Sequence, residues 1–183
     1  MYWVWIFWFY SFMGCWLEKV FAYLTRSPHQ IRKCFLLQPL CPVYGLSMVV
    51  VFLLPPDTTD TILHLAFFGG LCATAVEYMT HFIYEKTMGV MFWDYSNTKM
   101  DLNRRICMPF SVAWGILTVL AVWYVQPWVN GIIAGIPPIL DYIVVLLLIV
   151  DSFFSVRVLR KFHNIDLMSL PALMRELQMP QPR

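Results

Sequence analysis

Two glutamates stand inside strongly apolar stretches of the chain, where a charged group is costly. Glu18 lies six residues before the end of the apolar segment 2–24, and Glu77 lies six residues before the end of 61–83. At 1.5 Å per helical residue, both carboxylates would sit roughly 9 Å below the same membrane face. Acidic groups at such a depth face the interior of a helix bundle, where they are paired or protonated. Two of them held close together would share a proton, bind a cation or accept an arginine between them.

The sequence leaves two interpretations of this pair open. In the first, the pair is architectural, and a base on the same side supplies its partner: Arg32, Lys33, Arg104 or Arg105. In the second, the carboxylates belong to a binding site for a substrate or an ion. Both interpretations require the helices that carry Glu18 and Glu77 to be neighbours.

His81 and Glu85 follow Glu77 at intervals of four residues, so the three side chains share one face of a helix. Such a strip has the reach of a metal site or a proton relay. Because no second strip of His or Cys occurs elsewhere in the sequence, we expect no metal and no cofactor.

Asp94 stands between aromatic residues, directly before Tyr95. A short acid beside aromatic rings suits an interfacial turn, in which Asp94 accepts backbone N–H groups or an arginine. Catalysis by Asp94 would need a neighbouring nucleophile or base, and the sequence offers none nearby.

Enzyme signatures are absent from the sequence. It contains no GxxxxGK[ST], no HExxH and no GxSxG. Nucleotide hydrolysis by a P-loop is therefore excluded, and any transport driven by ATP would need a separate ATPase chain. The sequence favours a role other than that of an enzyme but leaves catalysis open.

The elements that position these residues are predicted to be transmembrane helices. The chain is 60% hydrophobic and 13% charged, with a mean hydropathy of +0.63; soluble domains carry roughly 25% charged residues. A net charge of +2 is too small to indicate nucleic acid. We predict an all-α, polytopic transmembrane helix bundle of about five spans. The spans are 2–24, 35–54, 61–83, 106–126 and 138–159.

The second span is predicted to be irregular. Pro39 and Pro42 interrupt its first half, so only Gly45 to Leu54 is expected to be a clean helix. The first half would be a broken or re-entrant segment, which the membrane allows only where protein or water satisfies the backbone.

Charge predicts the orientation. All thirteen Lys and Arg residues can be assigned to one side of a five-span bundle, and the positive-inside rule makes that side cytoplasmic. The N-terminus is then outside the cell membrane and the C-terminus inside. We expect one transmembrane domain over 1–160 and a cytoplasmic tail over 161–183. After Ser169, Leu170, Leu173, Met174 and Leu177 predict a short amphipathic helix that lies on the inner interface or docks to a cytoplasmic partner.

The spacing of small residues predicts close helix packing, and the pattern of the cysteines predicts free thiols. Gly131 and Gly135 have GxxxG spacing, and Gly69 with Ala73 repeats the pattern, which favours close helix packing within one chain or between copies. The five cysteines form no CxxC pair, so we expect small buried thiols and no disulfide.

Several short motifs together resemble a known family. They are Glu18, Cys41-Pro42-Val43-Tyr44-Gly45, Glu77-Tyr78, Glu85-Lys86, Trp93-Asp94-Tyr95-Ser96, Leu102-Asn103, Arg105-Ile106-Cys107 and Trp114-Gly115. From about Gly14 to Trp123, the chain resembles the bacterial membrane family labelled putative ABC-transporter type IV, or putative ABC transporter permease. The resemblance implies a permease-like protein. The candidate substrate- or ion-binding residues are Glu18, Tyr44, Glu77, His81, Glu85, Asp94, Tyr95, Asn103 and Arg105.

The chain departs from the family pattern at several positions. Cys34 follows Arg32-Lys33 where the family has an Asn-Arg-Gly-like stretch, and Gln38 replaces the glycine before Pro39. Arg104 replaces a glycine, and Asp101 replaces an asparagine. Because glycine gives access to positive φ, we expect that access to be lost at Arg104.

Three functions compete. The first is a small transport subunit that works with a cytoplasmic ATPase subunit or as a homo-oligomer. The second is a membrane-embedded enzyme that acts on a lipid or headgroup at the inner leaflet. The third is a non-catalytic assembly or sensing component. All three have membrane lipid as a partner and none involves nucleic acid.

Overall fold

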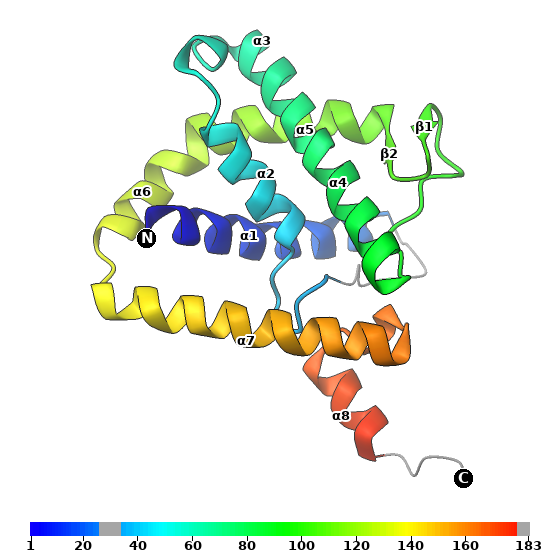
Figure 1. Ribbon diagram of the computed structural model, residues 1–183. Coiled ribbons are helices and arrows are strands. Elements are labelled where there is room, and N and C mark those ends of the chain that lie inside the picture. The colour runs from blue at the N-terminus through cyan, green and yellow to red at the C-terminus, as the bar shows by residue number, and fades with distance from the viewer. Residues whose placement is uncertain (26–33, 179–183) are drawn as a thin grey trace.

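The computed structural model describes residues 1–25 and 34–178, and most of these residues are helical (Figure 1). The predicted helical fold is confirmed at this level. The α-helices are α1 (Tyr2–Leu24), α2 (Pro42–Phe52), α3 (Ile62–His64), α4 (Gly70–Met88), α5 (Met108–Leu120), α6 (Gln126–Ala134), α7 (Pro138–Phe162) and α8 (Leu170–Gln178). Four of the basic residues on which the predicted topology depends lie outside the described residues: Arg26, Arg32, Lys33 and Arg183.

Three helices are long and apolar enough to cross a membrane. They are Ile62–Met88, Met108–Ala134 and Pro138–Phe162. α1 has 23 residues but is rich in tryptophan and tyrosine, and α2 has only 11. The count of five spans therefore stays a prediction.

Two of the long helices contain a π-helical turn. Leu65–Gly69 joins α3 to α4, and Ala121–Val125 joins α5 to α6. Pro127 has no N–H to continue a regular α-helix, and the π turn just before it absorbs the interruption. The predicted end of the fourth span at residue 126 was wrong for the helix, because the helix continues to Ala134.

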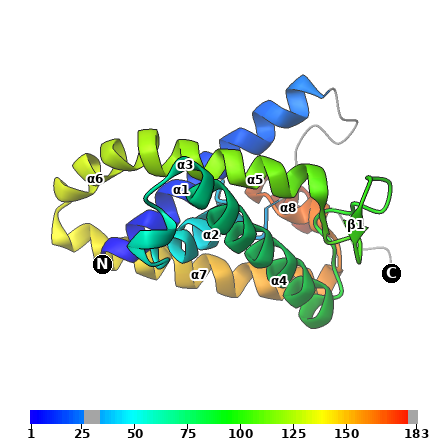
Figure 2. The same cartoon turned by 90° about the horizontal axis from the view of Figure 1, so that it is seen from above.

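Neighbouring helices pack in sequence order at the core. α1 packs against α2, α2 against α4, and α4 against α5. In Figure 1, α5–α6 and α7 run in roughly the same direction, and α2 and α4 cross them at an angle; α1 lies between them and is seen from above to cross them obliquely (Figure 2). The view from above shows α2 between α5–α6 and α7, and α4 crossing from the side of α5 to that of α7 (Figure 2).

The stretch before α2 is not helical, but its backbone is hydrogen-bonded to other elements. The amides of Leu37 and Gln38 donate to the two carboxylate oxygens of Asp151 on α7, at 3.0 and 3.1 Å. The amide of Cys41 donates to the Ser11 carbonyl of α1 at 2.9 Å. α2 then begins at Pro42, three residues before the predicted Gly45, because proline suits a first helical turn. The re-entrant depth of this stretch stays a prediction.

Two glycines allow α1 and α2 to approach closely. A Cβ at Gly14 would clash with the ring of Tyr44, and a Cβ at Gly45 would clash with Ser11 and the Phe7 carbonyl. The Tyr44 ring therefore packs directly against the backbone of α1, and this contact fixes the orientation of the ring.

A short β-hairpin, which was not predicted, precedes α5. β1 (Asp101–Leu102) pairs antiparallel with β2 (Ile106–Cys107). Asn103 and Arg104 in the turn have φ of 53° and 64°. The expected loss of positive φ at Arg104 was therefore wrong: the turn keeps that conformation, and Asp101 accepts the Arg104 amide at 3.0 Å. Both central residues at positive φ suit the twist of a hairpin.

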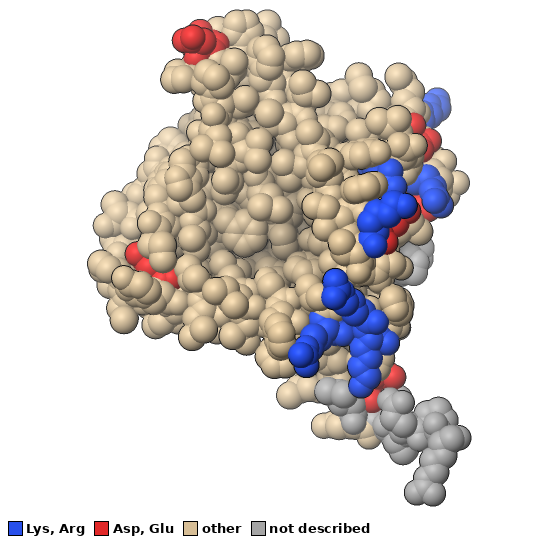
Figure 3. Space-filling view, in the orientation of Figure 1, with Lys and Arg blue, Asp and Glu red and all other residues tan. Residues whose placement is uncertain are grey.

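Polar contacts tie the helix ends together. At one end, Trp5 of α1 donates to Asp141 in the first turn of α7 at 2.6 Å. At the other end, the His163 ring hydrogen-bonds to the Met88 carbonyl, which joins the ends of α7 and α4, at 2.9 Å. The visible Lys and Arg side chains gather at this second end, near the hairpin and the end of α7 (Figure 3).

Candidate functional site

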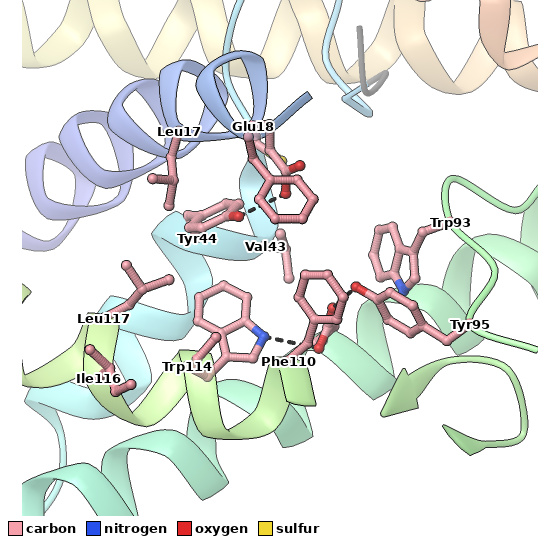
Figure 4. A pocket seen from close by; sticks show the side chains of 14 residues that line it. Leu17, Glu18, Val43, Tyr44, Trp93, Tyr95, Phe110, Trp114, Ile116 and Leu117 are labelled. Atoms are coloured by element: carbon pink, nitrogen blue, oxygen red, sulfur yellow. Dashed lines mark hydrogen bonds between the residues drawn. The ribbon is translucent and has the colours of Figure 1, made fainter. Parts of the chain in front are cut away.

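A cavity of about 290 Å³ opens between α1, α2, α4 and α5 (Figure 4). Its polar lining residues come from different elements: Glu18 from α1, Tyr44 from α2, Glu77 from α4, Tyr95 from the loop after α4, and Trp114 from α5. Most of the remaining wall is apolar. The cavity thus brings together residues that are up to 96 positions apart, from Glu18 to Trp114.

Glu77 is held by both of its carboxylate oxygens. The Tyr95 hydroxyl donates to Oε1 at 2.9 Å, and the Trp114 indole Nε1 donates to Oε2 at 2.9 Å. The residue is only 4% exposed. Hydrogen bonds to a buried acidic group are stronger than those between neutral groups, so this pair of donors orients the carboxyl group of Glu77.

Glu18 lies on the opposite wall of the cavity and is 5% exposed. The Tyr44 hydroxyl donates to its Oε1 at 2.7 Å (Figure 4). The rings of Tyr44 and Trp114 lie 4.8 Å apart between their centroids. The donors that hold the two carboxylates therefore contact each other, and Glu18 and Glu77 face one cavity.

The hairpin positions Tyr95. The Tyr95 amide donates to the Arg104 carbonyl at 2.9 Å, and the Tyr95 ring stacks on Phe110 of α5 with centroids 5.0 Å apart. Trp93, which also lines the cavity, donates from Nε1 to the Arg105 carbonyl at 2.9 Å. The fold of the loop thus carries two aromatic side chains into the cavity wall.

A second polar cluster lies beside the cavity around Arg105. Its guanidinium donates to the Glu85 carboxylate at 2.7 Å and to the Tyr78 hydroxyl at 3.0 Å. Asn103 donates to the same hydroxyl at 3.0 Å. The hydrogen bond to Glu85 raises the pKa of Arg105 above its ordinary value. These contacts clamp the hairpin to α4.

His81 lies between the cavity and the Arg105 cluster. It is 2% exposed, and its Nε2 lies 2.9 Å from the Trp93 carbonyl. Because a carbonyl only accepts, Nε2 must carry the proton. Nδ1 lies 3.8 Å from the Glu85 carboxylate, beyond hydrogen-bond distance. Among the described residues, no group of three or more His, Cys, Asp and Glu side chains could hold a metal ion.

Asp94 lies outside the cavity lining and caps its own turn. Its carboxylate accepts the Ser96 amide at 2.8 Å. This hydrogen bond lowers the pKa of Asp94 below its ordinary value. The structure therefore separates the candidates. Glu18, Tyr44, Glu77 and Tyr95 line the cavity, and Glu85, Asn103 and Arg105 form the adjacent clamp. His81 hydrogen-bonds to the Trp93 carbonyl, and Asp94 holds a turn.

Trp114 was not among the predicted site residues, although it holds Glu77. The Trp114-Gly115 motif was visible in the sequence, and a buried indole N–H needs an acceptor. A buried acid in another span was the natural acceptor, but only the packing of α4 against α5 shows that the two meet.

The fold and the cavity define a helical membrane protein with acidic groups buried between its helices. The family model described as "Putative ABC-transporter type IV" matches residues 5–157, and the chain belongs to this family. The match contains all of the candidate residues. Neither a curated protein nor a solved structure matches the chain.

Proposed function

We propose that the chain is the membrane-embedded, permease-like subunit of a transport system, and that Glu18 and Glu77 contribute to its substrate site. The observation that carries the proposal is the cavity that both side chains line within the part of the chain matched by the family. The family description favours ABC transport. This sequence contains no P-loop, and the proposal assigns ATP hydrolysis to a partner ATPase subunit.

The proposed topology has five spans, with the N-terminus outside and the C-terminus in the cytoplasm. Its support is the gathering of Lys and Arg at the end where α4 and α7 finish (Figure 3). Cysteine substitution tests it with a membrane-impermeant maleimide. Lys99→Cys should be labelled only from the cytoplasmic side and Asp57→Cys only from outside. Labelling of both from one compartment would contradict five spans.

Isolation of the complex tests the transport role. A tagged full chain, cross-linked in its own membranes and extracted in mild detergent, should bring with it a P-loop ATPase in fixed ratio. Arg160 and Lys161 are exposed at the basic end, so their replacement by Glu should reduce this association. Asp57→Asn, at an exposed position on the opposite end, is the control. Purification as a single chain without ATPase after cross-linking would overturn the proposal.

A further variant separates binding from architecture. Glu77→Gln keeps one carbonyl oxygen that accepts from Trp114, so the chain should fold and assemble with the ATPase. Loss of substrate-stimulated ATP hydrolysis in this assembled variant would support a binding role. Full stimulation in the variant, or loss of folding with Gln, would leave Glu77 an architectural residue.

A further inference from the structure

Three of the five cysteines lie together beside the candidate site. All five are free thiols in the structure. Cys15 of α1 and Cys34 and Cys41 of the non-helical stretch before α2 belong to one buried cluster, and they are 7%, 9% and 8% exposed. Cys34 is central, because its thiol is in hydrogen-bond contact with the thiols of both Cys15 and Cys41. The spacing of the cysteines in the sequence did not predict this contact.

The stretch 34–41 folds back on itself and so brings its two ends together. Fully extended, a chain of seven residues would separate Cys34 from Cys41 by roughly 23–25 Å. Instead their thiols touch, and Asp151 holds the middle of the stretch through two backbone amides, at 3.0 and 3.1 Å. The contact between the two thiols is therefore built into the path of the backbone.

Cys34 and Cys41 are better placed than Cys15 to form a disulfide. A disulfide needs a specific separation and direction of the two side chains. Cys15 lies in the middle of α1, whose backbone is fixed by helical hydrogen bonds, whereas the stretch 34–41 is not helical and can adjust. Cys34 and Cys41 also line a small cavity of about 10 Å³, which leaves their side chains some room to shift.

Cys41 is the thiol of this pair that a small oxidant can reach through the candidate site. It lines the cavity of about 290 Å³ that also contains Glu18 and Glu77. Hydrogen peroxide is uncharged and little larger than water, so a cavity of this size admits it. In the proposed topology this end of α1 faces the cytoplasm, where disulfides are usually transient and serve in redox sensing or catalysis.

We infer that Cys41 and Cys34 form a reversible disulfide in response to hydrogen peroxide. The Cys41 sulfur attacks one peroxide oxygen, the O–O bond breaks, and a sulfenic acid and one water form. The Cys34 sulfur then attacks the sulfenic sulfur, the S–O bond breaks, and the hydroxyl leaves as a second water with the proton of the Cys34 thiol. Two thiols are oxidised to one disulfide while one peroxide is reduced to two waters, and a dithiol reverses the reaction by exchange.

This oxidation would act on the wall of the candidate site. Cys41 is the residue directly before α2, and Tyr44 in the first turn of α2 donates to Glu18. A bond from Cys41 to Cys34 therefore links the redox state of the thiol cluster to the support of Glu18. The inference goes beyond the proposed function and does not depend on transport.

Peroxide treatment of the purified full chain in nanodiscs tests the inference. The chain is reduced, freed of reductant, treated with hydrogen peroxide and alkylated with N-ethylmaleimide in SDS. Because one disulfide consumes two of the five thiols, the alkylated thiols should fall from five to three, and dithiothreitol should restore all five. After digestion with trypsin and chymotrypsin, mass spectrometry should find the Cys34 peptide linked to the Cys41 peptide.

Three variants assign the roles of the thiols. Cys34→Ala removes the thiol that resolves the sulfenic acid, so no disulfide should form and dimedone, which reacts with sulfenic acids, should label Cys41. Cys41→Ala should give neither the disulfide nor the dimedone adduct. Cys15→Ala is the matched control within the cluster and should keep the disulfide between Cys34 and Cys41.

Several outcomes would overturn the inference. These are five free thiols after peroxide treatment, a disulfide between two copies of the chain on a non-reducing gel, or a link from Cys34 to Cys15 in place of Cys41. Dimedone labelling of Cys107 as strong as that of Cys41 in Cys34→Ala would also contradict it. The mapping of the disulfide uses only the wild-type chain, so it decides even where a variant fails to fold.

Discussion

Replacing Asp151 is expected to release the non-helical stretch that leads into α2. Asp151 is 7% exposed and accepts the Leu37 and Gln38 amides. In Asp151→Ala both amides lose their acceptor, at about 1–3 kcal/mol each, or roughly 2–6 kcal/mol together. Alanine also relieves the cost of a buried acidic group. We therefore expect Asp151→Ala to lower the free energy that holds this stretch in place by about 2–4 kcal/mol. Asp151→Asn keeps one acceptor oxygen and should lose about half as much.

Native cysteines report this local release. Cys34 and Cys41 flank the stretch and are 9% and 8% exposed, while Cys107, at the end of β2, is 1% exposed. Purified protein is treated with N-ethylmaleimide, and labelled peptides are quantified over time. Since each 1.4 kcal/mol is a factor of ten, Asp151→Ala should accelerate labelling of Cys34 roughly 30- to 700-fold. Cys107 should keep its wild-type rate.

Two results would refute this reasoning. If Cys34 reacts no faster in Asp151→Ala than in the wild type, the carboxylate does not hold the stretch. If Cys34 and Cys107 accelerate together, the substitution unfolds the whole protein, and the release is not local. Asp151→Asn should lie between wild type and Asp151→Ala.

Three further predictions concern stability, measured as the midpoint of thermal unfolding in detergent. A Cβ at Gly70 would lie 2.9 Å from the Gly115 Cα, so Gly70→Ala should destabilise the protein by about 1–3 kcal/mol. Gly131→Ala is the matched comparison: nothing lies within 4 Å of its Cβ, so it should stabilise the protein by up to about 1 kcal/mol. Trp114→Phe removes the indole donor to a buried acid and should cost about 1.5–3 kcal/mol. Arg104→Gly relieves a φ of 64° and should stabilise by about 0.5–1 kcal/mol.

Each prediction has an outcome that contradicts it. Equal midpoints for Gly70→Ala and Gly131→Ala would mean that α4 and α5 do not approach closely. An unchanged midpoint for Trp114→Phe would argue against the indole hydrogen bond. A lower midpoint for Arg104→Gly would show that the arginine side chain contributes more than its backbone conformation costs.

Much of the helix pattern could be predicted from apolar runs. α1 has the predicted bounds, and the last long helix begins at the predicted Pro138 and ends three residues beyond 159. Pro127 led to the wrong end for the preceding helix, since a proline ordinarily interrupts a helix and a π turn is not visible in hydropathy. The hairpin was missed because two-residue strands carry no periodicity.

The depth of the two glutamates could be predicted by counting residues, but their partners could not. Tyr44 and Trp114 are far from Glu18 and Glu77 in the sequence, and only the crossing of α1 with α2 and of α4 with α5 brings them together. The family resemblance pointed to Tyr44 and Tyr95 without assigning them partners. Arg104 shows the reverse limit, because a residue type that disfavours positive φ adopts it when the surrounding turn requires it.

The central claim is that Glu18 and Glu77 line one cavity between α1, α2, α4 and α5. A cryo-EM map of the full chain in lipid nanodiscs tests it most directly. We expect the map to show the Tyr44 hydroxyl against the Glu18 carboxyl group and the Trp114 indole against the Glu77 carboxyl group. A map in which α1 closes against α5, or in which Glu18 points away from Glu77 into lipid or water, would contradict it.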